Sequence, residues 1–266
     1  MAQRFIGKTI LVTGAGSVGP GWGNGRAAAV GFAEEGGVVI GVDCDLAAMD
    51  ETAERIEASG GRFERLTCDV TDNASIAAMV AGVKARHGRI DVLVNNVGGS
   101  ARGGPVEMAE EVWDLQLDLN LKSVFLTCKH VLPIMEAQGG GAIVNLASTS
   151  GIRWTGSAQV AYAASKAAVI QFSRVVAVQY AGQNIRVNTV VPGQMHTPMV
   201  EARLAGQRTG GDVTALLAQR LARIPLGFAG DGRDTAAAVM FLASEEARFI
   251  TGTELLVDGG MAARCD

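Results

Sequence analysis

The sequence predicts an α/β fold in which a doubly wound parallel sheet of about seven strands carries helices on both faces. Short apolar runs without polar alternation recur along the chain, as in strands that are buried on both faces. Segments with helical periodicity separate these runs. Of the 266 residues, 48% are hydrophobic and 19% are charged, enough for one large core. We expect a single domain over residues 1–266, because neither a linker nor a repeat interrupts this pattern.

The expected strands are short, and the third is the weakest. They span residues 9–12, 38–42, 65–68, 92–94, 142–146, 185–190 and 254–257. The expected helices span residues 27–35, 46–59, 74–87, 112–138, 160–181 and 234–244. Pro133 should kink or break the fourth helix near its end, because proline lacks the N–H that the helical ladder needs. No strand is expected in residues 194–228, which we interpret as a lid or substrate loop.

Charge and composition argue against several classes of protein. The formal net charge is -4 at pH 7 and no run of five basic residues occurs, so we expect neither a nucleic-acid partner nor a membrane partner. No stretch of 18 consecutive apolar residues occurs, so we expect no segment that spans a bilayer. The four cysteines are widely spaced, which predicts free thiols in a reducing compartment. Since no apolar signal segment follows Met1, we expect a cytoplasmic protein.

A glycine-rich loop follows the first strand and leads into the first helix. Its candidate ligand contacts are Gly14, Ser17, Gly23, Asn24 and Gly25. Glycine lets backbone N–H groups approach a pyrophosphate closely, and a helix N-terminus adds unpaired donors and a partial positive charge. The loop therefore indicates a dinucleotide site, although a glycine-rich turn with only a folding role would have the same sequence.

Acidic residues end the second and third strands. Asp43 lies 18 residues beyond Gly25, where a carboxylate can accept hydrogen bonds from the adenosine ribose hydroxyls and repel a 2′-phosphate. It therefore favours NAD over NADP; the alternative role, a helix cap, suits Asp45 better. Asp69, followed by Val70, could face the adenine amino group, and a turn at the strand end explains it almost as well.

Polar residues also end the fourth and fifth strands. Asn96 and Gly98 belong to a turn of two amides and two glycines, which we interpret as a polar floor for the cofactor; a plain loop is the alternative. Ser148 ends the fifth strand. Because the carboxyl ends of parallel strands form the ligand crevice, its hydroxyl can hold a substrate oxygen there, unless it only makes a turn.

Tyr162 and Lys166 are four residues apart in the expected helix 160–181, so they share one helix face. A free tyrosine has a pKa of about 10, and a neighbouring ammonium lowers that pKa. Such a tyrosine can exchange a proton with an alcohol or carbonyl oxygen near neutral pH. Taken alone, the spacing is common, and a core tyrosine beside a surface lysine is the usual explanation. Asn120 lies inside helix 112–138, a poor place for asparagine unless its amide holds a water in a proton path.

Together these motifs resemble the short-chain dehydrogenase/reductase family, in its branch with chains of about 250 residues. The match runs from Lys8 to Gly260. It includes Thr13-Gly14, Asn95-Asn96-Val97-Gly98, Asn120, Ser148, Tyr162-x-x-x-Lys166, Pro192-Gly193 followed by Thr197, Ile250-Thr251-Gly252 and Val257-Asp258-Gly259-Gly260.

The resemblance implies a Rossmann-type, dinucleotide-binding domain with a catalytic tetrad. The tetrad would consist of Asn120, Ser148, Tyr162 and Lys166. The resemblance also implies that Thr197 and the backbone near Met195, following Pro192 and Gly193, meet the nicotinamide carboxamide. Finally, it implies a homotetramer built through the two long helices and the last strand.

The sequence departs from the family pattern at three places. Residues 18–22 extend the glycine loop, so the pattern leaves open which glycines touch the pyrophosphate, and Trp22 either covers the cofactor or packs away from it. Val97 stands where the family usually has alanine and adds bulk beside the cofactor. Thr149 competes weakly with Ser148 for the hydroxyl role.

We expect an NAD-dependent oxidoreductase that interconverts a secondary alcohol and a ketone by hydride transfer. One alternative is a 3-oxoacyl-thioester reductase that uses NADPH; Arg26 could favour it, but Asp43 opposes the phosphate. An enoyl reductase is suggested by the longer glycine loop and disfavoured by the spacing of Tyr162 and Lys166. A non-catalytic dinucleotide-binding protein is the third alternative, against which the complete tetrad argues.

The substrate is expected to be a small apolar or cyclic molecule. Its expected contacts are Ser148, Trp154, Tyr162, Gln194, His196 and Met199. Arg153 could pair with a carboxylate, although a solvated loop arginine is the simpler explanation. His196 does not cluster with His87 or His130, so we expect no metal site.

Overall fold

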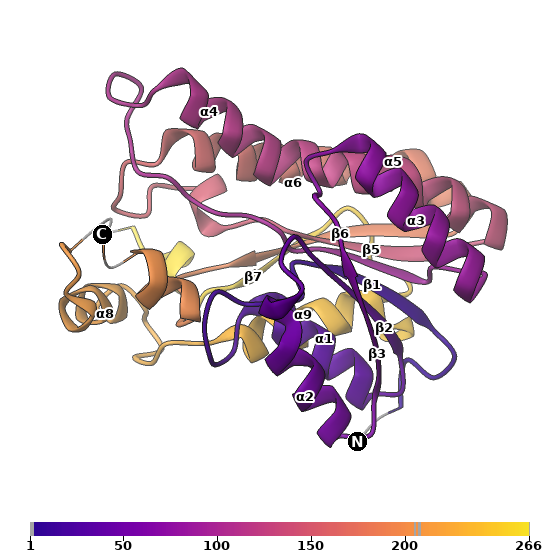
Figure 1. Cartoon of the computed structure of the whole chain (residues 1–266). Coiled ribbons are helices and arrows are strands. Elements are labelled where there is room, and N and C mark those ends of the chain that lie inside the picture. The colour runs from indigo at the N-terminus through magenta and orange to yellow at the C-terminus, as the bar shows by residue number, and fades with distance from the viewer. Residues whose placement is uncertain (1–2, 205, 207–208, 266) are drawn as a thin grey trace.

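The computed structural model describes residues 3–204, 206 and 209–265. Figure 1 shows a sheet between two layers of helices. Within the described residues, the sheet has seven parallel strands in the order β3-β2-β1-β4-β5-β6-β7. The chain runs outward from β1 to β3 and then, from β4, outward in the other direction to β7. The predicted doubly wound α/β fold is therefore confirmed.

The strands lie close to the expected positions. They are β1 (Thr9–Thr13), β2 (Val38–Asp43), β3 (Arg62–Thr67), β4 (Val92–Asn95), β5 (Gly141–Leu146), β6 (Ile185–Pro192) and β7 (Glu254–Val257). The third strand begins three residues earlier than the apolar run, because Arg62 already pairs with Val38 of β2. As an edge strand it exposes polar side chains, which hides it from a search for continuous apolar residues.

Helices cover both faces of the sheet. They are α1 (Asn24–Glu34), α2 (Asp50–Ala58), α3 (Asn73–His87), α4 (Glu110–Leu117), α5 (Ser123–Gln138), α6 (Val160–Tyr180), α8 (Val213–Leu221) and α9 (Gly232–Ala243). In Figure 1, α1, α2 and α9 lie below the sheet, whereas α3, α5 and α6 lie above it. Among the described helices, none combines the length and the apolar character that crossing a bilayer requires.

Alternate residues of each central strand build two separate cores. In β1, Leu11 belongs to the core under α3, α5 and α6, while Ile10 and Val12 belong to the core over α1 and α9. All three are completely buried. Each such side chain contributes about 1.5–3 kcal/mol on burial. Because both faces of these strands are covered, their sequences read as continuous apolar runs.

The helix expected over residues 112–138 is interrupted, but the interruption does not lie at Pro133. Five residues of π-helix, Asp118–Lys122, separate α4 from α5, and α5 continues through Pro133 to Gln138. Inside the π-helical turn, the Asn120 side chain donates a hydrogen bond to the carbonyl of Gln116 at 2.9 Å. The side chain thus partners a carbonyl at the point where the regular α-helical ladder changes.

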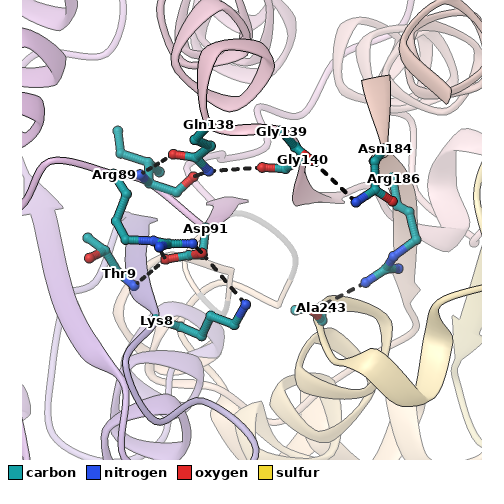
Figure 2. Close-up of polar contacts among 11 residues, drawn as sticks. Lys8, Thr9, Arg89, Asp91, Gln138, Gly139, Gly140, Asn184, Arg186 and Ala243 are labelled. Atoms are coloured by element: carbon teal, nitrogen blue, oxygen red, sulfur yellow. Dashed lines mark hydrogen bonds and ion pairs between the residues drawn. The ribbon is translucent and has the colours of Figure 1, made fainter. Parts of the chain in front are cut away.

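Figure 2 shows polar contacts at the edge where the strands begin. The buried Asp91 carboxylate accepts hydrogen bonds from the Thr9 amide and from Arg89 Nε, both at 2.8 Å, and lies 3.7 Å from Lys8 Nζ. Arg186 donates to the carbonyls of Leu242 and Ser244, at 2.6 and 3.0 Å. Charged groups at this edge are therefore matched to partners of the opposite sign or to carbonyls that end α9.

Candidate active site

A cavity of about 870 Å³ opens at the other edge of the sheet, where the strands end. Ligand pockets in proteins span roughly 300–1,000 Å³. The segments that follow β1 to β6 all contribute to its lining. The neighbours β1 and β4 lead away in opposite directions, and an open α/β sheet binds its ligands in the crevice at such a switch point.

Most of the site residues predicted from the sequence line this cavity. They are Gly14, Ser17, Gly23, Asn24, Gly25, Asp43, Asp69, Val70, Asn96, Gly98, Ser148, Tyr162, Lys166, Pro192, Gly193, Gln194, Thr197 and Met199. Three others lie outside the lining. Asn120 is completely buried, Trp154 is 73% exposed, and His196 is exposed with its Nε2 3.4 Å from a Glu201 oxygen. The positions of Trp154 and His196 give no support to their expected substrate contacts.

The glycine loop brings the N-terminus of α1 against the end of β1. A Cβ on Gly25 would lie 1.9 Å from the carbonyl oxygen of Gly14, so only glycine allows this approach. Asn96 braces the loop by donating from its side-chain amide to the Gly14 carbonyl at 2.9 Å. The N-cap residue of α1, Gly23, supplies no side-chain cap, and the first turn holds no acidic residue. The first N–H groups of α1 therefore favour an anion at the cavity wall.

Arg26 binds the additional loop residues 18–22, of which Val18 lines the cavity. Its Nη1 donates to the Gly21 carbonyl at 2.6 Å and pairs with Glu51, also at 2.6 Å. Trp22 packs against the core beside α1, with the Arg55 guanidinium 4.2 Å from its ring centroid. Trp22 therefore packs away from the cavity, and the buried Arg26 is engaged by its own loop rather than facing a 2′-phosphate position.

The acidic residues at the ends of β2 and β3 differ in what binds them. One Asp43 oxygen accepts a hydrogen bond from the Gly16 amide at 3.1 Å, which holds the carboxylate at the cavity wall. Asp45 accepts from the Ala47 amide at 3.0 Å, which makes a local turn; no described side chain caps the short helix that begins at Ala47 or the helix α2. Asp69 accepts from the amide and hydroxyl of Thr71, and these bonds lower the pKa of Asp69. The turn explanation for Asp69 is thus supported, although the residue also lines the cavity.

Lys166 is a buried cation beside Tyr162. Its Nζ donates to the Leu146 carbonyl at 2.8 Å and lies 5.9 Å from the Tyr162 ring centroid. The residue is 2% exposed, and burial lowers the pKa of Lys166 from 10.5 to about 8. A Cβ on Gly98 would lie 3.0 Å from this Nζ, so glycine leaves room for the ammonium at the cavity floor.

The Asn120 side chain holds the loop after β4 through the backbone of Gly99. Its Oδ1 accepts a hydrogen bond from the Gly99 amide at 3.1 Å, and its Nδ2 donates to the Gly99 carbonyl at 3.0 Å. The same Oδ1 would be 2.7 Å from a Cβ on Gly98. The π-helical turn thus brings the asparagine amide close to the position occupied by Lys166 Nζ, as π-helical turns often do at functional sites.

Ser148 follows β5 and, like Tyr162, lines the cavity. Its backbone is extended, and its hydroxyl accepts a hydrogen bond from the Ser150 amide at 3.2 Å. Thr149 is almost completely buried and also lines the cavity. The structure therefore leaves both hydroxyls at the site, with Ser148 at the strand end.

Two buried polar residues of the lining were missed in the sequence. Gln159, just before α6, donates to the Ser150 hydroxyl at 2.6 Å. Arg220, on α8, is 8% exposed and donates to the Met195 carbonyl at 2.9 Å. A polar residue just before the helix 160–181 was a usable signal for Gln159. Arg220 had none, because a contact between α8 and the end of β6 depends on tertiary structure alone.

The comparisons with known proteins agree with this geometry. The family model described as "Enoyl-(Acyl carrier protein) reductase" matches residues 20–262. The chain is 40% identical over 259 residues to the 3-oxoacyl-(acyl-carrier-protein) reductase FabG of Thermotoga maritima, covering 97% of this chain and 99% of the relative. It is 38% identical over 263 residues to the 2-(R)-hydroxypropyl-CoM dehydrogenase of Xanthobacter autotrophicus, covering 97% and 100%. A crystal structure of a short-chain dehydrogenase/reductase from Burkholderia xenovorans is 64% identical, with a TM-score of 0.96 and 99% coverage of both chains.

Proposed function

Because the chain belongs to the short-chain dehydrogenase/reductase family, whose oxidoreductases bind a nicotinamide dinucleotide, we propose that it is an NAD-dependent enzyme that interconverts a secondary alcohol and a ketone. One observation carries the proposal. A buried ammonium, Lys166, lies 5.9 Å from the Tyr162 ring at the floor of a ligand-sized cavity. Burying a cation without a neighbouring carboxylate lowers the stability of the fold. A buried ammonium beside a phenol in a cavity is therefore a candidate for a role in catalysis.

The residues at the mouth of the cavity fit a dinucleotide. The N-terminus of α1, with Gly23 and Gly25, suits the pyrophosphate, since Gly25 leaves the backbone uncovered there. Asp43 suits the adenosine ribose, and Asp69 with Val70 suits the adenine. At the other end of the cavity, Pro192, Gly193 and Thr197 suit the nicotinamide carboxamide, and Asn96 and Gly98 form the floor between the two ends.

In the proposed reaction, Pro192, Gly193 and Thr197 would hold a nicotinamide, which would provide the hydride chemistry. Tyr162 accepts the proton of the substrate hydroxyl in the oxidation and returns it to the carbonyl oxygen in the reduction. Ser148 donates a hydrogen bond to the same oxygen. The positive charge of Lys166 favours the phenolate form of Tyr162. Asn120 positions Lys166 and the loop after β4, and it supports a water path from the ammonium to solvent.

We propose NAD rather than NADP as the cofactor. The Asp43 carboxylate at the ribose position would repel a 2′-phosphate, and Arg26 is engaged by Gly21 and Glu51. The alternative is a 3-oxoacyl-thioester reductase that uses NADPH, which the similarity to FabG favours. The body of the substrate is expected to be small and apolar or cyclic, since Val97, Leu119 and Met199 line the inner cavity.

We also propose that the protein is a homotetramer and that it is located in the cytoplasm. Apolar side chains are exposed on α5 (Phe125), on α6 (Val175 and Val178) and on β7 (Leu256). These are the elements through which a homotetramer of this family would form, and burial of such side chains favours association. The four cysteines are free thiols, which suits the cytoplasm as a reducing compartment.

An absorbance assay at the nicotinamide band tests the proposal with NAD and NADP against secondary alcohols and with NADPH against a 3-oxoacyl thioester. We expect NAD to be reduced by secondary alcohols, and Tyr162→Phe to lose turnover by about 10³-fold because the proton acceptor is gone. NADH binding, measured by fluorescence, should persist in this variant. Full turnover by Tyr162→Phe, or thioester reduction with NADPH as the main activity, would contradict the proposal.

A further inference from the structure

A second cavity, of about 170 Å³, adjoins the main one and carries positive charge. Arg102, Arg220 and Arg223 line it, and its described lining holds no Asp or Glu. It lies among the loop after β4, the loop after β5 and the helix α8. An anion bound among these guanidinium groups would gain charge-assisted hydrogen bonds.

The backbone holds two of these arginines at the cavity. Arg220 Nη2 donates to the Met195 carbonyl at 2.9 Å, and Arg223 donates to the Thr155 carbonyl. A Cβ on Gly156 would lie 2.2 Å from Arg223 Nη1, so a glycine is needed for the guanidinium to rest there. A guanidinium carries five N–H donors in a planar fork, so one bond to a carbonyl leaves Arg223 able to bind an oxyanion.

Gln194 connects this cavity with the main one, because its side chain lines both. The residue is 7% exposed, and its Oε1 is buried without a hydrogen-bond partner among the described residues. Leaving such an acceptor unsatisfied costs roughly 1–3 kcal/mol. A ligand that extends from one cavity into the other would pass this oxygen and could satisfy it with a hydroxyl or amide N–H.

We propose that the substrate carries an oxyanion, namely a carboxylate, sulfonate or phosphate, which Arg102, Arg220 and Arg223 bind while its reacting carbon lies at Tyr162. Guanidinium groups recognise oxyanions through paired N–H donors, which gives direction as well as charge. The inference rests on the proposed function and makes it more specific. The substrate becomes an apolar body with a charged end, anchored so that one carbon is presented to the cofactor.

The test compares matched pairs of substrates, each a hydroxy acid with a secondary hydroxyl group and its methyl ester. In the wild type, kcat/KM for the acid should exceed that for the ester by about 10- to 100-fold, as a lost charged hydrogen bond predicts. Arg223→Gln and Arg102→Gln should abolish this preference, mainly through KM for the acid. Both arginines are exposed, so neither substitution should disturb folding. Arg248→Gln is the matched control, since Arg248 is exposed and lines neither cavity.

The outcomes separate the two proposals. Esters turned over as fast as acids, with no change in Arg223→Gln, would overturn the inference and leave the proposed function intact. If the wild type oxidises neither member of any pair with NAD, the proposed function fails. Calorimetric titration with succinate then tests the cavity alone. Saturable binding weakened at least tenfold in Arg223→Gln supports the site, and absent or unchanged binding refutes it.

Discussion

The two edges of the sheet bury charged groups in opposite ways. Where the strands begin, Asp91 is surrounded by donors from Thr9, Arg89 and Lys8 (Figure 2). Where the strands end, Lys166 is even more deeply buried, yet its ammonium donates to a neutral carbonyl, and burial lowers its pKa to about 8. The first edge surrounds its buried carboxylate with cations, whereas the second leaves its buried ammonium without a carboxylate among the described residues.

Four buried side-chain polar atoms lack a partner among the described residues, and two of them lie at the cavity; the other two are Thr235 Oγ1 in α9 and Glu254 Oε2 at the start of β7. Asn24 Oδ1 and Gln194 Oε1 are buried without partners in the described part of the chain, and both residues line the main cavity. At the opposite edge, Gln138 both donates to and accepts from the backbone of Ile90. Functional sites retain polar groups that lower the stability of the fold, because groups placed to bind a ligand lack hydrogen-bond partners within the protein. Substitutions at the two edges should therefore have opposite effects.

Lys166→Met should give the largest effect. Removing the ammonium withdraws the charge that favours the Tyr162 phenolate, so we expect turnover to fall by about 10³-fold at pH 7. The loss should lie in kcat rather than in the affinity for NADH. Lys129→Met, at an exposed lysine of α5, is the control and should retain activity. Wild-type turnover by Lys166→Met would show that the buried cation has no part in the reaction.

Asp43→Asn tests whether the carboxylate at the end of β2 determines the cofactor preference rather than the stability of the fold. Within the described part of the chain, the Asp43 carboxylate accepts from backbone amides and has no cationic partner. We expect the preference for NAD over NADP, as a ratio of kcat/KM, to fall by about 10- to 100-fold, because a charged hydrogen bond is lost and a repulsion removed. The free energy of unfolding should change by less than about 1 kcal/mol. An unchanged preference would remove Asp43 from the ribose site.

The sequence predicted the site best where the sheet itself dictates position. Ser148, Tyr162 and Lys166 follow a buried strand, and parallel pairing brings all strand ends to one edge. Prediction was poorer in irregular segments, where no periodicity sets the direction of a side chain. Trp154 and His196 belong to such segments, and neither lines the cavity.

Long-range contacts explain the remaining differences. Arg26 looked like a possible phosphate ligand, but its partners, Gly21 and Glu51, lie in the extended loop and on α2. Arg153 was expected to be solvated or to meet a carboxylate, yet it donates to the carbonyls of Ala262 and Arg264. The interruption at Asn120 depends on Gly99, more than 20 residues away in the chain. Neither composition nor spacing contains such pairings.

The pH dependence of the free energy of unfolding tests whether the buried Lys166 destabilises the fold, in contrast to the paired Asp91. Below pH 8, Lys166 is charged in both states and its burial opposes folding. Between pH 8 and 10.5 the folded lysine is neutral while the unfolded one keeps its proton, so the unfolded state binds more protons and stability from this group rises with pH. The lowered pKa of Lys166 corresponds to a destabilisation of roughly 3 kcal/mol at neutral pH. The hydrogen bond from Lys166 to the Leu146 carbonyl offsets about 1 kcal/mol of this cost.

Lys166→Met should therefore unfold with a free energy about 2 kcal/mol higher than the wild type at pH 7, and this difference should close by pH 10. Denaturant titrations of both proteins at the two pH values measure it. Cys128, with its raised pKa, is shared by both proteins, and a Tyr162→Phe background removes the coupled phenol from the comparison. A variant less stable than the wild type at pH 7 would mean that the buried ammonium stabilises the fold.

Asp91→Asn is the matched substitution at the opposite edge and should act mainly on stability. The asparagine keeps one acceptor for Thr9 but loses the charge that Arg89 and Lys8 surround. Since Arg89 is half exposed and can be rehydrated, we expect a loss of about 1–2 kcal/mol in the free energy of unfolding. The cofactor preference and kcat should stay within about twofold, because the substituted group lies at the far ends of the strands. Reduced kcat at unchanged stability would show that the edges are coupled and that the division of labour between them is wrong.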